Sequence, residues 1–188
     1  MKNKTNQFSR RDFMKLAGML TASAALPDSM VQVFAAGLEK MAVHTPVIWL
    51  QGQSCSGDSV SLLNTCDPEP ADLLTRYITL IMHQNVGAAQ GQTFMDILKK
   101  CESCKDYMLV IEGSIPLSMP EACIIGGRTI EDILLKLVPN AAGVLAIGTC
   151  AAFGGIPAAV GNETGAASVI DCVVKHMLKG HDKLGACR

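Results

Sequence analysis

Residues 47–58 read VIWLQGQSCSGD, a short apolar run that leads into a polar segment with two glycines. An apolar run of this length, bounded by turn residues, is typical of a strand buried on both faces. The pattern recurs further along the chain, so we predict strands over 47–50, 77–82, 107–111 and 143–147, with a short candidate at 123–125.

Helical patterns lie between these runs. Residues 94–98 have helical spacing after Gly91, and residues 166–178 form a pattern that ends near Gly180. Thr129 and Asp132 form a capping box at the start of a helix that stops at Pro139. Short apolar strands that alternate with helices predict parallel pairing. The expected fold is α/β, a flavodoxin-like, doubly wound and mostly parallel sheet flanked by helices.

Composition excludes several classes of protein. The chain has 188 residues, of which 49% are hydrophobic and 18% charged, which rules out intrinsic disorder. A net charge of −1 and 4% aromatic residues argue against a nucleic-acid partner. The apolar runs fall short of the ~20 residues that a membrane helix needs. We expect one globular domain.

The N-terminal segment has the features of an export signal. Arg10 and Arg11 precede the apolar run 16–26, and small residues follow at 33–37. This order resembles a twin-arginine signal, although an ordinary amphipathic helix with two surface arginines is the alternative. We predict a signal peptide at 1–36, a linker at 37–46 and the domain at 47–188. The protein would then lie in the periplasm or on the outer face of the cytoplasmic membrane. Because that route carries folded proteins, it raises the expectation of a metal or redox centre.

Chemically active residues follow several of the predicted strands. Cys55 and Asp58 come after the first strand, Glu112 ends the third, and Cys150 follows the strand at 143–147. In a doubly wound sheet the carboxyl ends of the strands form the binding edge. Thiolates gathered there suit an iron–sulfur cluster or zinc, although either cysteine alone is more often a packed apolar residue. A buried Asp58 would need a partner or a cation.

Four motifs resemble the small subunit of nickel–iron hydrogenases. They are WLQGQSCSGDSVSLLN at 49–64, VIEGSIP at 110–116, GTCAAFGGIPAA at 148–159 and NETG at 162–165. They occur in the order of that family, and the resemblance covers roughly residues 45–180.

The resemblance implies a proximal 4Fe–4S cluster that exchanges electrons with a nickel–iron centre on a separate large subunit. Cys55 and Cys150 match two cluster ligands, and Asp58 stands where the family has a second cysteine. The family's later P-G-C-P-P ligand is absent, which leaves Cys187 as the candidate fourth ligand. Hydrogen activation would belong to the partner, so no catalytic residue is expected here. A membrane or soluble cytochrome would be the electron acceptor.

Two features leave alternatives open. The chain stops at Arg188, before the last strand and the C-terminal cluster domain of the family, so we expect a truncated or frame-shifted reading frame. Glu112 is either part of a proton path at the large-subunit interface or a carboxylate that accepts backbone amides in a tight turn. The alternative functions are a stand-alone exported flavodoxin-like binding or redox module, which could bind flavin, and a non-functional fragment.

The other cysteines carry weaker signals. Cys101 and Cys104 form a C-x-x-C pair, which indicates a redox pair, a structural disulfide or packed thiols. A zinc site there would need Cys123 and His83 as further ligands. We predict that Cys66, Cys123 and Cys172 are packing residues. The histidines show no ligand spacing.

Overall fold

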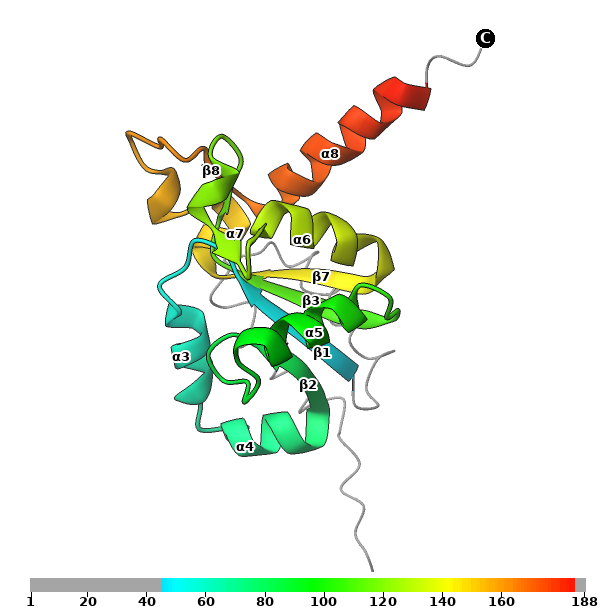
Figure 1. Ribbon diagram of the computed structural model, residues 1–188. Coiled ribbons are helices and arrows are strands. Elements are labelled where there is room, and N and C mark those ends of the chain that lie inside the picture. Colours follow the sequence, from blue (N-terminus) through cyan, green and yellow to red (C-terminus); the bar gives the residue numbers. More distant parts are fainter. Residues whose placement is uncertain (1–44, 185–188) are drawn as a thin grey trace, which may run out of the picture.

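A four-stranded parallel sheet forms the centre of the computed structural model, which describes residues 45–184. Its strands are β1 (Thr45–Gln51), β2 (Ile78–His83), β3 (Tyr107–Glu112) and β7 (Ala141–Ile147), in the spatial order β2-β1-β3-β7 (Figure 1). Each neighbouring pair is parallel. The predicted α/β fold with a mostly parallel sheet and flanking helices is confirmed.

Helices connect the strands. The segment between β1 and β2 contains α3 (Gly57–Leu63), α4 (Pro70–Asp72) and the π-helical turn η1 (Leu73–Tyr77). The segment between β2 and β3 contains α5 (Gly91–Cys101). Before β7 come α6 (Ile130–Leu137) and the 3₁₀ turn η3 (Val138–Asn140). After β7 come α7 (Gly148–Phe153), the 3₁₀ turn η4 (Ile156–Ala158) and α8 (Val169–Leu184).

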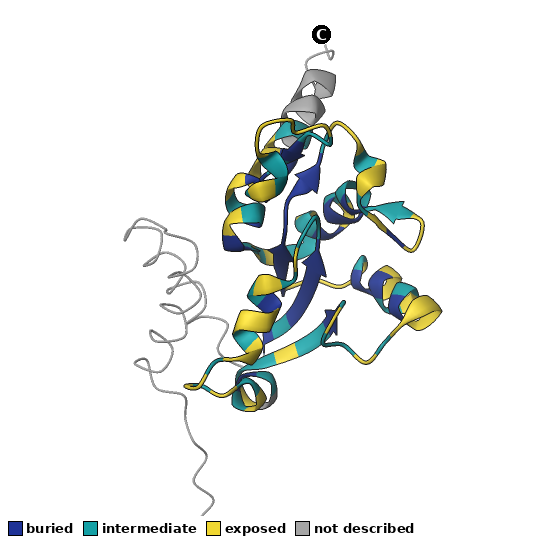
Figure 2. Ribbon diagram, turned by 90° about the vertical axis from the view of Figure 1, so that its left-hand side faces the viewer, coloured by how far each residue is buried: buried dark blue, intermediate teal, exposed yellow. Residues whose placement is uncertain are grey.

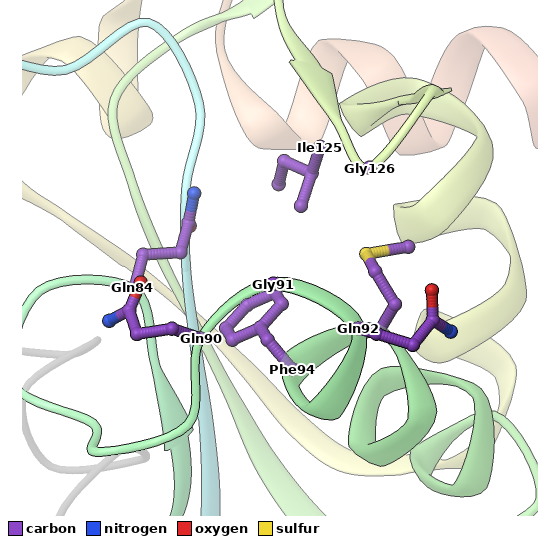
Figure 3. A pocket seen from close by; sticks show the side chains of 8 residues that line it. Gln84, Gln90, Gly91, Gln92, Phe94, Ile125 and Gly126 are labelled. Carbon is purple, nitrogen blue, oxygen red and sulfur yellow. The ribbon is translucent and has the colours of Figure 1, made fainter.

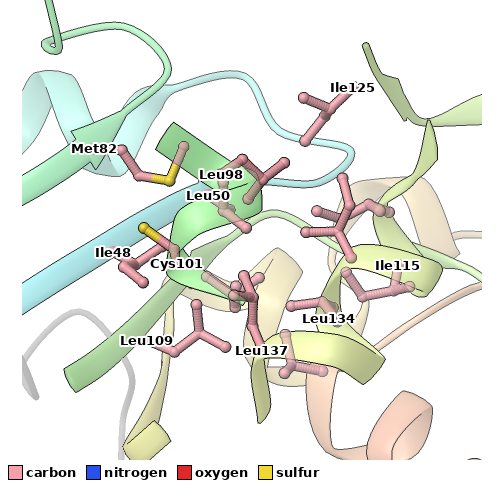
Figure 4. Packing of buried hydrophobic residues seen from close by; sticks show 14 of the residues in the cluster. Ile48, Leu50, Met82, Leu98, Cys101, Leu109, Ile115, Ile125, Leu134 and Leu137 are labelled. Carbon is pink, nitrogen blue, oxygen red and sulfur yellow. The ribbon is translucent and has the colours of Figure 1, made fainter. Parts of the chain in front are cut away.

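The main hydrophobic core lies between one face of the sheet and helices α5 and α6. Ile48 and Leu50 of β1 alternate onto this face, as the period of two along a strand requires. They pack in one cluster with Leu98 of α5 and Leu134 of α6, all without exposed surface (Figure 4). The central strands β1 and β3 are almost entirely buried, whereas the edge strands β2 and β7 are partly exposed (Figure 2).

A smaller cluster occupies the opposite face of the sheet. It contains Val47 and Trp49 of β1 with Met108 and Val110 of β3, and Leu62 of α3 packs against it. Helical residues therefore contact both faces, as the doubly wound prediction requires.

The strand candidate at 123–125 does not join this sheet. Ile124–Ile125 forms β5, which pairs antiparallel with β6 (Arg128–Thr129) in a separate hairpin. Gly126 and Gly127 both have positive φ, which turns the chain back too tightly for a parallel crossover. A second short pair joins β4 (Ile115–Pro116) and β8 (Ala166–Ala167), and the 3₁₀ turn η2 (Pro120–Ala122) precedes β5.

The predicted boundaries differ from the structure in small ways. The Thr129 side chain accepts a hydrogen bond from the Asp132 amide, which confirms the capping interaction. β1 begins at Thr45, before the predicted domain start at 47. The last helix begins at Val169 instead of 166 and continues past Gly180.

The predicted signal peptide at 1–36 lies outside the described residues. None of the described helices is both long and apolar enough to cross a lipid bilayer.

Candidate functional site

Three strands end side by side at the carboxyl edge of the sheet. Gln51 of β1 pairs with Glu112 of β3, and Glu112 pairs with Ile147 of β7. The loop with Cys55 follows β1, and α7, which contains Cys150, begins directly after β7. Both cysteines therefore follow strands that end at the same edge, where α3 and α7 begin (Figure 1).

A backbone bridge holds the loop that leads to Cys55. The Gln53 amide donates to the Ser114 carbonyl at 2.8 Å, and the Ser114 amide donates to the Gln53 carbonyl at 3.1 Å. Gly113 has φ +91, and a Cβ atom there would lie 2.7 Å from the carbonyl oxygen of Gln53. Only glycine allows this approach without strain. The loops after β1 and β3 are thus fixed to each other just before the first cysteine.

Asp58 lies against the start of α7. A Cβ atom on Gly148 would come within 2.0 Å of the Asp58 Oδ2, so the carboxylate rests on the backbone of Gly148. Cys150 follows two residues later in the same helix. Burial and the nearby Glu112 carboxylate raise the pKa of Asp58 above its usual value. A half-buried carboxylate beside another negative charge gains free energy from a bound cation.

Glycines keep space open beside both thiols. A Cβ atom on Gly57 would lie 3.1 Å from the Cys55 Sγ, and one on Gly155 would lie 2.5 Å from the Cys150 Sγ. Cys55 is exposed and Cys150 is half-buried. Within residues 45–184, the three donors Cys55, Asp58 and Cys150 are not gathered within 4.8 Å of one another, as ligands of a single ion would be. A four-iron cluster is larger than one ion and is bound by donors that stand further apart.

Glu112 is an internal anchor for this edge. It has no exposed surface, and it accepts hydrogen bonds from the backbone amides of Asp58 (3.1 Å) and Ser59 (3.3 Å). The Trp49 indole and the Gln51 side chain also donate to it, at 3.2 and 3.0 Å. The prediction of a carboxylate that accepts backbone amides is confirmed. The other alternative, a proton path at a large-subunit interface, stays a prediction.

Opposing effects set the ionisation of Glu112. Burial alone raises its pKa, but hydrogen bonds from Ser59, Gln51 and Trp49 outweigh burial and hold the pKa below its usual value. The carboxylate is therefore ionised at neutral pH. Its charge fixes the first turn of α3, which carries Asp58.

His83 extends the Glu112 network, and the sequence did not indicate this role. The His83 Nδ1 accepts hydrogen bonds from the amides of Asn85 and Val86, at 3.1 and 3.3 Å. The neutral ring therefore carries its proton on Nε2, which lies 3.2 Å from the Ser59 Oγ. The Ser59 hydroxyl in turn donates to Glu112. Burial lowers the pKa of His83, and the Glu112 charge opposes this in part. The sequence signal that could have indicated this role is the position of His83 at the carboxyl end of strand β2.

A hollow of about 470 Å³ lies beside the end of β2, apart from the cysteines (Figure 3). Gln84, Gln90 and Phe94 line it together with Met95 and Ile125. Its lining contains no charged group and no thiol.

The remaining cysteines are free thiols where the structure describes them. Cys101 is buried, and burial together with Cys104 raises its pKa to about 11, which disfavours the reactive thiolate. Both ring nitrogens of His83 have hydrogen-bond partners, Ser59 on one side and the Asn85 and Val86 amides on the other, which argues against the zinc site considered for Cys101 and Cys104. Cys172 is buried as predicted, whereas Cys66 is exposed, so its predicted packing role is wrong. Cys187 lies outside the described residues.

Comparison with known proteins identifies the family. Residues 55–183 match the family described as "NADH ubiquinone oxidoreductase, 20 Kd subunit". The chain belongs to this family. Residues 7–27 match the twin-arginine translocation signal, which confirms the predicted export to the periplasm.

The relatives of this family member are hydrogenase small subunits, as the motifs indicated. The chain is 34% identical over 178 residues to the periplasmic NiFeSe hydrogenase small subunit of Desulfomicrobium baculatum, covering 87% of this chain and 56% of that one. It is 40% identical over 162 residues to the quinone-reactive Ni/Fe-hydrogenase small chain of Wolinella succinogenes, covering 84% and 46%. The chain thus spans about half the length of these relatives.

Solved structures agree with this assignment. The recombinant NiFeSe hydrogenase from Desulfovibrio vulgaris Hildenborough matches with a TM-score of 0.68 and 45% identity, over 71% of this chain and 50% of that chain. The reduced, active Ni-Fe-Se hydrogenase from Desulfomicrobium baculatum matches with a TM-score of 0.69 and 36% identity, over 71% and 52%.

Proposed function

We propose that this chain holds a proximal 4Fe–4S cluster at the carboxyl edge of its sheet. In this role it would carry electrons to or from the nickel–iron centre of a hydrogenase large subunit. The observation that carries the proposal is the convergence of Cys55, Asp58 and Cys150 on one edge, in a chain whose relatives are hydrogenase small subunits.

The donor set fits such a cluster. Cys55 and Cys150 supply thiolates, which iron–sulfur clusters require, and the Asp58 carboxylate is a harder oxygen donor. Gly57 and Gly155 leave the space beside each sulfur clear. Cys187 is the proposed fourth ligand. A bound cluster supplies a one-electron redox centre at this edge, while Glu112 holds the turn that carries Asp58.

The surface next to Cys150 is suited to a protein partner. Phe153, Ile156 and Val160 follow it in sequence and are 65%, 87% and 108% exposed. Exposed apolar side chains grouped near a binding site mark a contact surface. We assign this surface to the large subunit, and a membrane or soluble cytochrome would exchange electrons with the assembled protein.

Cluster loading tests the ligand assignment. The full-length chain is reconstituted anaerobically with iron and sulfide, and iron content and electron paramagnetic resonance are measured. Cys150→Ser should abolish loading because it removes a ligand, whereas the matched control Cys101→Ser should load like the wild type. Equal iron content in the two variants contradicts the assignment, and so does retention of flavin without iron.

Asp58→Cys examines the oxygen ligand. If Asp58 binds iron, a cysteine at this position should retain the cluster and change its resonance spectrum. Loss of iron in Asp58→Cys would count against a ligand role. Co-purification of a hydrogenase large subunit with the export precursor tests the partner.

A further inference from the structure

A second group of metal-binding side chains lies outside the carboxyl edge. Glu131, Cys172 and His176 place one donor atom each within 4.8 Å of one another. The His176 Nε2 lies 2.6 Å from the Glu131 Oε1. Cys172 is fully buried, while the side chains of Glu131 and His176 are 14% and 26% exposed. The group is therefore enclosed on one side and open to water on the other.

Two packed helices bring these donors together. Cys172 and His176 stand four residues apart in α8, so they share one face of that helix. Glu131 lies in the first turn of α6, whose start lies close to α8 (Figure 1). Both helices have tertiary contacts that hold these positions: Leu134 of α6 and Cys172 of α8 belong to the main core.

We propose that Glu131, Cys172 and His176 form a binding site for Zn²⁺ with a fourth position open to water. Thiolate, imidazole and carboxylate together are the donors of zinc, whereas calcium and magnesium prefer oxygen alone. Bond lengths of about 2.0 to 2.3 Å place tetrahedral donors roughly 3.3 to 3.8 Å apart. The donors lie within 4.8 Å of one another, and the Glu131 and His176 atoms, at 2.6 Å, would move apart when an ion enters between them.

The environment of Cys172 determines whether its thiol must lose a proton when Zn²⁺ binds. Burial and the Glu131 charge raise the pKa of Cys172 to about 11, and Lys175 opposes this in part. The thiol is therefore protonated at neutral pH, and Zn²⁺ takes the place of that proton when the sulfur–zinc bond forms. The Lys175 ammonium lies 3.9 Å from the Glu131 Oε1 and also donates to the Leu117 carbonyl at 3.3 Å. Lys175 thus competes with the metal for Glu131 without being a ligand.

The contrasting explanation is an ion pair with no metal function. Glu131 and His176 would stabilise the contact between α6 and α8 by themselves, and Cys172 would only fill space. The two explanations differ in one respect: only the zinc site needs the sulfur.

Cobalt is the probe because its bond to a thiolate absorbs in the near ultraviolet. The full-length chain carries Cys55→Ala and Cys150→Ala, which remove the thiols at the sheet edge. We expect one equivalent of Co²⁺ to bind with a thiolate charge-transfer band, and Zn²⁺ to displace it. Absence of binding overturns the proposal.

Further substitutions in the chain that carries Cys55→Ala and Cys150→Ala show which residues bind the metal. Cys172→Ala should remove the band, while the control Cys123→Ala, at a half-buried thiol, should keep it. His176→Gln retains a polar partner for Glu131 and should weaken Co²⁺ binding by about 10-fold or more. Lys175→Ala should strengthen binding because it removes the competing charge. A band that persists in Cys172→Ala, or binding unchanged in His176→Gln, overturns the proposal. These outcomes are independent of cluster loading at the sheet edge.

Discussion

The face of the sheet that packs against α5 and α6, here called the covered face, lies next to the carboxyl edge of the sheet. The two regions are built from adjacent residues of the same strands. In β3, Ile111 packs into the apolar cluster with α5 and α6, and Glu112, the next residue, accepts hydrogen bonds from two backbone amides and several side chains. In β1, Leu50 and Gln51 repeat this change. Burial is nearly the same for these residues, but the first of each pair is satisfied by apolar contact and the second by polar partners.

The buried residues of the two regions are stabilised in different ways. The covered face gains free energy from many interchangeable contacts, so its stability is spread over many residues. The edge depends on one carboxylate, whose loss leaves several buried donors without a partner. Removal of the edge carboxylate should therefore cost far more free energy of unfolding than an exchange between apolar side chains of similar size on the covered face.

Glu112→Ala gives the largest expected effect. It leaves the donors of Trp49, Gln51 and Ser59 unsatisfied, so we expect the free energy of unfolding to fall by about 3 kcal/mol or more. Urea denaturation measures it. The control Glu163→Ala, at an exposed carboxylate, should change stability by less than about 0.5 kcal/mol. A loss below about 1 kcal/mol for Glu112→Ala would remove the contrast between edge and face.

Gly148→Ala should have the next largest effect. Both Gly148 and Gly127 have positive φ, at +74 and +81, but only a Cβ on Gly148 meets another group, the Asp58 carboxylate. Gly127→Ala therefore measures backbone strain alone, about 1 to 2 kcal/mol. Gly148→Ala should cost about 1 to 3 kcal/mol more because of overpacking, and it should lower iron loading. Equal costs for the two variants would show that the Asp58 contact is unimportant.

The pH dependence at His83 is the smallest expected effect. Burial lowers the pKa of His83 below 6.5, so the unfolded chain binds a proton more readily than the folded chain. His83 therefore contributes stability that is present above this value and is lost as the pH falls through the folded pKa. Urea midpoints at about pH 7.5 and 5.5 should differ less for His83→Gln than for the wild type. If the difference between the two urea midpoints is the same in His83→Gln and in the wild type, His83 is not the source of the pH dependence.

The sheet was predictable because each strand is a continuous apolar run. Runs such as 107–111 carry the signal of a strand buried on both faces, and local pattern determines them. The hairpin at 124–129 was misassigned because two-residue strands carry almost no periodic signal. Helix α7 was missed because its six residues, GTCAAF, begin with glycine and lack amphipathic spacing.

The candidate site was predictable where residues follow strands directly. The placement of Cys55, Asp58 and Cys150 at one edge was predicted in this way, because the carboxyl ends of parallel strands lie at the same edge. The partners of Glu112 could not be derived, since Trp49, Ser59 and His83 come from separate segments and meet only through tertiary packing. Glu131 is likewise distant in sequence from Cys172, which hid their proximity.

The sequence contains one tryptophan, Trp49, and its position makes it an intrinsic fluorescence probe of the carboxyl edge. The Trp49 indole donates to Glu112 and lies with its ring centre 4.9 Å from that of His83. Its emission therefore senses the interior directly behind the cysteine loop. Fluorescence quenching can follow the arrival of an iron–sulfur chromophore as it happens, without a label.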